Sequence, residues 1–189
     1  MFVVSSHFIG NFKLGDNIAH NLQVLSLLYE KQNDCTDAQK VMLCKPIIVT
    51  IASICEAVLS DFHFKVRVYT IEGVENLSDE ILNYIRGKKI DEFGKYIASS
   101  KKHNLFDAND NQIYESLDKM RKLRNRIHIQ NTKNHYEPDE IIAFSLQRQR
   151  EMEITLENVL KTMATKYPRP KNATGFVNDF NVPWEERLT

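Results

Sequence analysis

The sequence is poor in residues that bend or cross-link a chain. Its 189 residues include six glycines, five prolines and three cysteines, with no internal repeat or low-complexity segment. This composition excludes collagen-like and low-complexity classes and is that of an ordinary globular domain. The three cysteines, Cys35, Cys44 and Cys55, form neither a CxxC motif nor an even-numbered set. They therefore favour reduced cytoplasmic thiols over a disulfide framework.

Four common catalytic signatures are also missing. The chain has no GxSxG, P-loop, GxGxxG or HExxH motif. Apart from His128, its histidines are scattered without the spacing of metal ligands, so we expect neither a metal nor a cofactor. Cys55 falls in an apolar segment, where burial makes a thiol unreactive. The formal net charge is zero, so any binding to nucleic acid must come from a local basic patch.

The sequence shows no secretory leader and no long apolar run. Residues 1–7 lack a basic region followed by a long apolar stretch. The most apolar segment, residues 47–59, is shorter than the about 20 residues that a membrane helix needs. These observations predict a cytoplasmic protein with no membrane association.

Helical periodicity predicts an all-α, up-and-down bundle of four to five main helices. We expect a first helix capped by Asp16 and an apolar central helix that starts near Asp37 or Lys45, with Pro46 either opening or kinking it. Residues 62–74 alternate in polarity and could form a short strand or an extended connection.

The second half of the chain has clearer helix boundaries. Short helices are expected from Ser78 to a stop at Gly87 and over residues 90–100, and longer ones over residues 109–130 and 137–166. We expect one helical domain over residues 1–167. The remaining tail, residues 168–189, is predicted to be a strap or partly disordered.

Four side chains in the expected helix at residues 109–130 repeat with helical spacing. Arg121, Arg124, Asn125 and His128 lie three, four or seven positions apart, and these steps return to one side of a helix. The buried stripe of the same helix is expected to be Ile113, Leu117, Met120, Leu123 and Ile127. Because the two faces adjoin, the four side chains should be partly desolvated at the edge of a groove or subunit interface.

These side chains suit metal-free phosphate chemistry. Desolvation and neighbouring cations favour a neutral His128, which could act as a general base near pH 7. Arg121 and Arg124 could bind a phosphodiester and stabilise the charge that develops on it, and Asn125 could orient it. RNA carries its own nucleophile, the 2′-OH. Cleavage of RNA therefore needs only a base, an acid and an anion-binding group.

The neighbouring charges allow both a functional and a structural interpretation. Lys122 and Arg126 extend the basic patch and are candidates for RNA binding. Basic residues near a helix C-terminus are also common because they interact favourably with the helix dipole. Glu56, a carboxylate in an apolar helix, needs a partner, for which Arg121 or Arg124 is suited. That ion pair could be purely structural, or it could orient an active-site arginine.

Residues 123–128, LRNRIH, resemble the signature of HEPN domains, which are small α-helical proteins that include many bacterial ribonucleases. The motif of that family is an arginine, usually followed by a polar residue such as asparagine, then a histidine after four to six intervening residues. The buried helix with Glu56 and the final long amphipathic helix also look like this fold. The resemblance covers roughly residues 16–167.

The resemblance implies a metal-independent endoribonuclease that acts on RNA as a homodimer. Arg124, Asn125 and His128 of both subunits would then meet at a shared cleft. Members of the family often serve as toxins, paired with a nucleotidyltransferase-type antitoxin, or as effectors of phage defence. Other members are binding or scaffolding modules, so the alternative function is a non-catalytic module that binds nucleic acid, nucleotide or a protein.

The motif leaves open which arginine is the principal one. Three residues separate Arg124 from His128, fewer than in the family pattern, although Arg124 carries the expected Asn125. Six residues separate Arg121 from His128, within the pattern, but Arg121 is followed by Lys122. Helical geometry favours Arg124, because a step of four places it directly beside His128.

Overall fold

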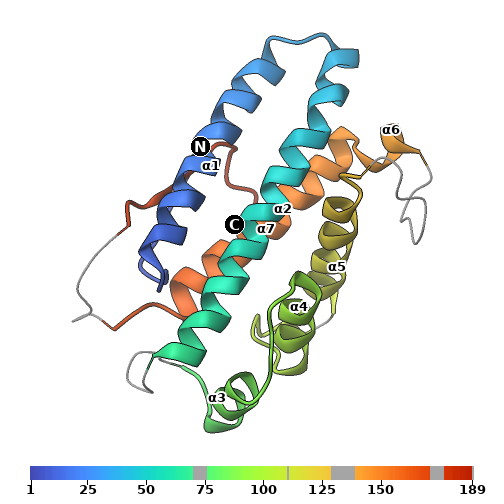
Figure 1. Cartoon of the computed structure of the whole chain (residues 1–189). Coiled ribbons are helices and arrows are strands. Elements are labelled where there is room, and N and C mark those ends of the chain that lie inside the picture. The colour runs from blue at the N-terminus through green and yellow to red at the C-terminus, as the bar shows by residue number, and fades with distance from the viewer. Residues whose placement is uncertain (70–75, 110, 129–138, 171–176, 189) are drawn as a thin grey trace.

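The computed structural model describes residues 1–69, 76–109, 111–128, 139–170 and 177–188. Within these residues the protein is mostly helical, with six helices of eight or more residues packed together (Figure 1). They are α1 (Phe12–Asn33), α2 (Asp37–Val68), α3 (Asp79–Arg86), α4 (Phe93–Lys102), α5 (Gln112–Asn125) and α7 (Leu146–Lys166). A four-residue helix, α6 (Glu140–Ala143), lies before α7. The prediction of a helical fold is therefore confirmed.

Helix α2 is the central element of the fold. It packs against α1, α3, α4, α5 and α7. It begins at Asp37, where Thr36 and Gln39 form a capping box, and Pro46 lies inside it. It also continues through residues 62–68, where the sequence suggested a strand or an extended connection. Phe62 and Val66 are buried, so the apolar face of the helix extends two more turns than expected.

Helix α2 is longer than the apolar segment that the sequence suggested was too short to span a membrane. Over 18 residues its mean hydropathy is 1.9, so by length and composition it could cross a membrane. Shortness therefore does not exclude a membrane span. In this fold 44% of that window is buried inside the protein, and its isoleucines form the centre of the core.

Local capping explains where the other helices begin. Helix α1 begins at Phe12, because the Asn11 side chain accepts a hydrogen bond from the backbone N–H of Leu14; the predicted start at Asp16 is wrong. Helix α3 matches the prediction, with Ser78 as its N-cap and Gly87 as its C-cap.

The expected last helix is two helices. Asp139 caps α6 and Ser145 caps α7, so the break falls between them. The predicted start at residues 137–138 lies outside the described residues. The apolar stripe expected on α7 is buried in the core, and its members are Met152, Leu156, Val159, Leu160 and Met163. The predicted end before Tyr167 is confirmed.

The two ends of the chain meet in a small antiparallel sheet that the sequence did not predict. Strand β1 (Phe2–Val4) pairs with β2 (Phe180–Val182), with Phe2 opposite Val182. Beyond β2, the tail packs on the helices, where Trp184 is 4% exposed and its ring lies 5.9 Å from the ring of Tyr29 on α1. This tail closes the core on the side of α1 and α7.

Candidate functional site

Helix α5 ends at Asn125, which is five residues earlier than predicted. Arg126 follows as the C-cap, and the backbone N–H of Ile127 bonds to the carbonyl of Arg124 in a tight turn. Leu117, Met120 and Leu123 are buried as expected, whereas Ile127 is 49% exposed. Ile127 is therefore not part of the buried stripe of α5.

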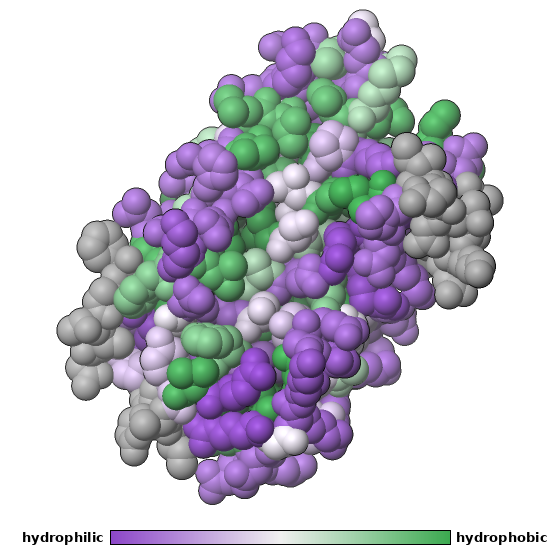
Figure 2. Space-filling model, viewed as in Figure 1, coloured by the Kyte–Doolittle hydropathy of each residue, from purple (hydrophilic) through white to green (hydrophobic). Residues whose placement is uncertain are grey.

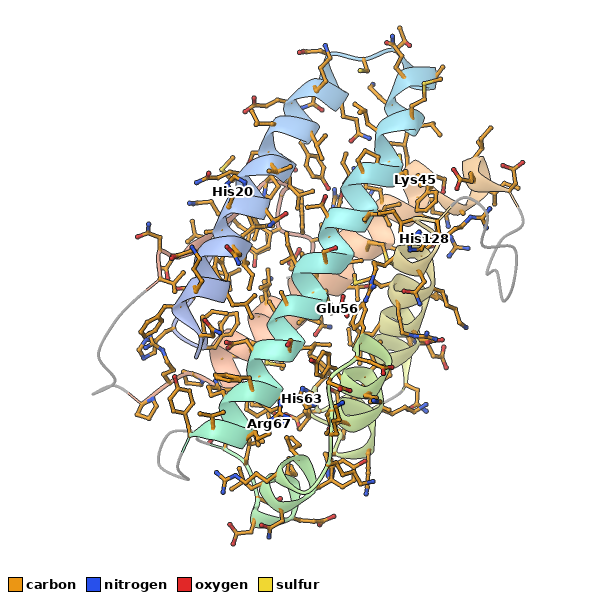
Figure 3. The ribbon with its side chains drawn as sticks, in the orientation of Figure 1. His20, Lys45, Glu56, His63, Arg67 and His128 are labelled. Carbon is orange, nitrogen blue, oxygen red and sulfur yellow. The ribbon has the colours of Figure 1, made fainter. Side chains whose placement is uncertain are left out.

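His128 therefore does not lie on the helical face that the spacing predicted. It follows the turn after α5 and is exposed, and Figure 3 shows it past the end of α5, away from Glu56 in the middle of α2. The step of four that should place Arg124 beside His128 does not apply outside the helix. The expected desolvation of His128 is also wrong for this chain, because the side chain faces solvent.

Arg124 pairs with Glu56, as the sequence allowed. The Arg124 Nη2 atom lies 2.6 Å from both carboxylate oxygens of Glu56, and the two side chains are 32% and 28% exposed. The guanidinium carbon also lies 6.0 Å from the centre of the Phe93 ring. The Nε atom of Arg124 is buried and has no hydrogen-bond partner among the described residues. Glu56 thus anchors Arg124 through one nitrogen and leaves another donor unused.

A pocket of about 320 Å³ opens beside this ion pair. Glu56 of α2 forms one wall, the start of α4 with Phe93 and Gly94 forms another, and α5 closes it. The residues that α5 contributes are Arg121, Arg124 and Asn125. Three of the predicted site residues on α5 and the predicted supporting residue Glu56 therefore line one pocket.

The first turn of α4 adds to the electrostatics of this pocket. Glu92 is the N-cap residue, but its side chain does not cap the helix, and the first turn itself carries no acid. The backbone N–H groups of Phe93 and Gly94 lie in the orphan first turn, at the positive end of the helix dipole. Asp91 and Glu92 also line the pocket, and Lys95 pairs with both of them.

Asp118 organises the other cations of α5. It accepts hydrogen bonds from Arg121, at 2.9 and 2.7 Å, and pairs with Lys122 at 2.9 Å. Partial burial raises the pKa of Asp118, but the hydrogen bonds from Lys122 and Arg121 outweigh this and hold the pKa below its usual value. One carboxylate therefore holds two cations in place and stays charged.

Asn125 and Arg126 differ in what they can offer a ligand. Asn125 is exposed at the end of α5 and on the rim of the pocket. Arg126 is only 8% exposed and already interacts with other groups of the protein. Its position does not suit the RNA contact that was expected from the sequence.

Sequence reasoning missed Asp118, Gly94 and the acids before α4. A signal for Asp118 was present, because a carboxylate three and four residues before Arg121 and Lys122 makes ion pairs on a helix. Gly94, Asp91 and Glu92 reach the site only through the packing of α4 on α5, which no local pattern indicates.

Comparison of the chain with models of protein families, with curated proteins and with solved structures finds no match in any of the three.

The chemistry of this site follows from its geometry. The pocket is lined by the cations Arg121 and Arg124 and by the carboxylates of Glu56, Asp91 and Glu92, of which Lys95 pairs with the last two. The two arginines are held in place by Asp118 and Glu56. Such an arrangement can bind a phosphate that competes for the arginines' remaining donors.

Proposed function

We propose that this protein is a metal-independent endoribonuclease of the HEPN type. Arg124 binds the scissile phosphate, and His128 acts as the general base toward the attacking 2′-OH or as the general acid toward the leaving oxygen. The observation that carries the proposal is the Glu56–Arg124 pair at the wall of a pocket. An arginine anchored through one terminal nitrogen keeps its orientation, and its other terminal nitrogen, Nη1, is the donor that would bind an incoming phosphate. Asn125 on the pocket rim would orient the phosphate.

The exposure of His128 is consistent with a site completed by a second subunit. In one chain the helix that carries Arg124 ends before His128, so Arg124 and His128 are not held side by side. In a homodimer, His128 of one subunit could serve the phosphate bound by Arg124 of the other. Proton transfer by a positioned histidine would then contribute the general acid–base part of the catalysis.

Apolar side chains near this end of the molecule support the contact between two copies. Ile127, next to His128, is 49% exposed, and Ile141 and Met42 are 71% and 75% exposed. Ile141 and Met42 line a mostly apolar pocket of about 520 Å³ between α2 and α6. Exposed apolar surface of this kind commonly marks a protein contact. We therefore place the dimer interface at the end of the molecule formed by the start of α2 and α6.

The test is cleavage of a mixed-sequence RNA by the purified protein in EDTA. His128→Ala should reduce the cleavage rate by about 100-fold or more, the contribution typical of general acid–base catalysis. Arg124→Gln should reduce it to a similar extent, because the phosphate loses its anchored cation. Circular dichroism and sedimentation should show unchanged helicity and association.

Two matched variants control for the loss of a histidine and of an arginine. His20→Ala removes an exposed histidine on α1, and Arg150→Gln removes an exposed arginine on α7. Both should cleave as the wild type does. Undiminished cleavage by His128→Ala and Arg124→Gln would refute the proposal, and so would a wild-type protein that never cleaves.

One observation favours a second candidate, the non-catalytic binding module. Both carboxylate oxygens of Glu56 already contact Arg124, and Asp118 already holds Arg121. If these pairs do not yield to a substrate, the basic face would bind RNA or nucleotide without turnover. Binding would then fall with rising salt, and no variant would change the integrity of the RNA.

A further inference from the structure

A second pocket, of about 430 Å³, lies between α4 and α5 and adjoins the candidate site. Gly94 lines both pockets, so they meet across the first turn of α4. The second pocket is lined by Lys101 of α4 and by Lys119 and Lys122 of α5. Figure 2 shows that the surface over α4 and α5 is largely hydrophilic. We call these two adjoining pockets, which are lined by Arg124 at one end and by Lys101 at the other, the groove.

The two cations that pair with Asp118 line different pockets. Arg121 lines the pocket of the candidate site, and Lys122 lines the second pocket. Both pair with the carboxylate of Asp118. The positive charges of Arg121 and Lys122 therefore lie on either side of the one negative charge of Asp118. A polyanion that crosses the boundary would meet a cation on each side of it.

The glycine at this boundary lets the Arg121 side chain pack on the first turn of α4. A Cβ atom at Gly94 would lie 3.5 Å from Cδ of Arg121, an ordinary van der Waals contact, so the fold has room for alanine here. A longer side chain would have to displace the Arg121 side chain. A strand that passes from the first pocket to the second would therefore cross Arg121 at this boundary.

We propose that the second pocket is a further phosphate-binding subsite, in which Lys101, Lys119 and Lys122 hold the single-stranded RNA that extends from the candidate site. The proposal rests on the function proposed above and adds the path of the substrate. The lysines are point charges on flexible stems, which suits a backbone phosphate more than a specific base. Glu115 and Asp118 also line this pocket. Their negative charges would repel a phosphate that came closer to them than to the lysines.

The test compares RNA affinities for two lengths of ligand, measured in the His128→Ala protein so that no cleavage intervenes. The ligands are an oligouridylate of roughly 16 nucleotides and a uridine dinucleotide. Replacing Lys101 and Lys119 by glutamine should weaken binding of the longer RNA by about tenfold, which corresponds to one charge-assisted hydrogen bond. The loss for the dinucleotide should be much smaller, because it reaches only the first pocket.

Salt dependence gives a second readout of the same variant. The slope of log affinity against log salt should become less steep by about 0.7 for each phosphate of the single strand that the variant no longer neutralises. A matched variant, Lys13→Gln with Lys31→Gln, removes two exposed lysines of α1 that line neither pocket. It should leave both the affinity and the slope unchanged.

A steric variant tests the boundary between the two pockets. Gly94→Leu would displace the Arg121 side chain and should weaken binding of the long RNA by several-fold, whereas Gly94→Ala should bind nearly as the parent does. If the Lys101 and Lys119 variant binds both ligands as tightly as the parent does, the subsite is overturned. A loss of affinity in that variant that is the same for both ligands would overturn it as well.

The outcomes separate this proposal from the one on which it rests. Cleavage that depends on His128 but ignores the groove variants would keep the ribonuclease and remove the subsite. Length-dependent binding that needs Lys101 and Lys119, in a wild-type protein that never cleaves RNA, would keep the subsite and remove the catalytic proposal.

Discussion

Two carboxylate clusters in this protein differ in how completely their oxygens are paired. On α7, the side chains of Glu153 and Glu157 are 2% and 0% exposed. Glu153 accepts hydrogen bonds from Tyr29 and from the Arg187 guanidinium. Glu157 accepts from the backbone N–H groups of Arg187 and Leu188, and Lys161 pairs with it.

The candidate site has the opposite character. The Glu56–Arg124 pair is about one-third exposed, it borders a pocket, and the Nε atom of Arg124 has no partner among the described residues. A buried, fully paired carboxylate stabilises one structure, whereas solvent can reach a partly exposed pair. The tail cluster therefore holds the fold together, while the α2–α5 pair lies at the wall of a pocket.

The largest expected effect comes from breaking the tail cluster. Arg187→Ala removes the cation from Glu153 and should lower the free energy of unfolding by about 3 kcal/mol, because a buried charge loses its partner. Urea unfolding followed by circular dichroism measures it. Glu185→Ala, an exposed neighbour in the tail, should change stability by less than about 0.5 kcal/mol. Equal effects of the two substitutions would contradict the role assigned to the tail.

An effect of at most the same size is expected from acid, through His63 on the same helix as Glu56. Burial lowers the pKa of His63 to about 4, only partly opposed by its hydrogen bond to the Leu59 carbonyl. Its ordinary pKa in the unfolded chain is about 6.5, so the unfolded state binds more protons between these values. The stabilisation is present above pH 6.5 and is lost as the pH falls toward 4.

The size of this acid effect is up to about 3 kcal/mol, from the difference between the two pKa values. Because carboxylates titrate in the same range, the measurement is the difference between wild type and His63→Gln in urea unfolding at pH 6.5 and pH 4. The wild type should lose more stability than the variant on acidification. His20→Gln, on the exposed surface of α1, should behave as the wild type. A parallel response of His63→Gln and the wild type would show that His63 is not held neutral by the fold.

The smallest expected effect is that of the candidate site on stability. Glu56→Gln should lower the free energy of unfolding by about 1 kcal/mol, since each side chain is about one-third exposed and solvent screens the ion pair. The same substitution should reduce the rate of RNA cleavage by more than this loss of stability explains, because Arg124 loses its anchor. A loss of stability as large as that of Arg187→Ala would erase the contrast between the two clusters and indicate a purely structural role for Glu56.

Local signals predicted much of the fold. Ser78 and Gly87 delimit α3 because a hydroxyl caps a helix start and the chain turns at a glycine after it. The apolar repeat of α7 is buried as expected, since its spacing can face only one side. The need of Glu56 for a cationic partner was likewise foreseeable, because a carboxylate in an apolar helix is costly alone.

Other features depended on contacts between distant segments. Helix α5 ends at Asn125, and Ile127, which the periodicity alone had placed in the core, is not buried. The pairing of Phe2 with Val182 joins the two ends of the chain, and no local pattern encodes it. Gly94 entered the site because α4 packs on α5.

The residue pattern alone indicated that the chain is mostly helical, that Glu56 in the apolar central helix needs a cationic partner, and that cations gather on the helix of Arg121 and Arg124. These properties follow from the periodicity of apolar residues and from the cost of burying charge, both of which act within a few turns of helix. Packing between helices selected Arg124 as that cation, left His128 apart from it, and brought Lys101 and Lys119 to the lining of one pocket. Those outcomes depend on which helices touch, and packing sets that across the whole chain.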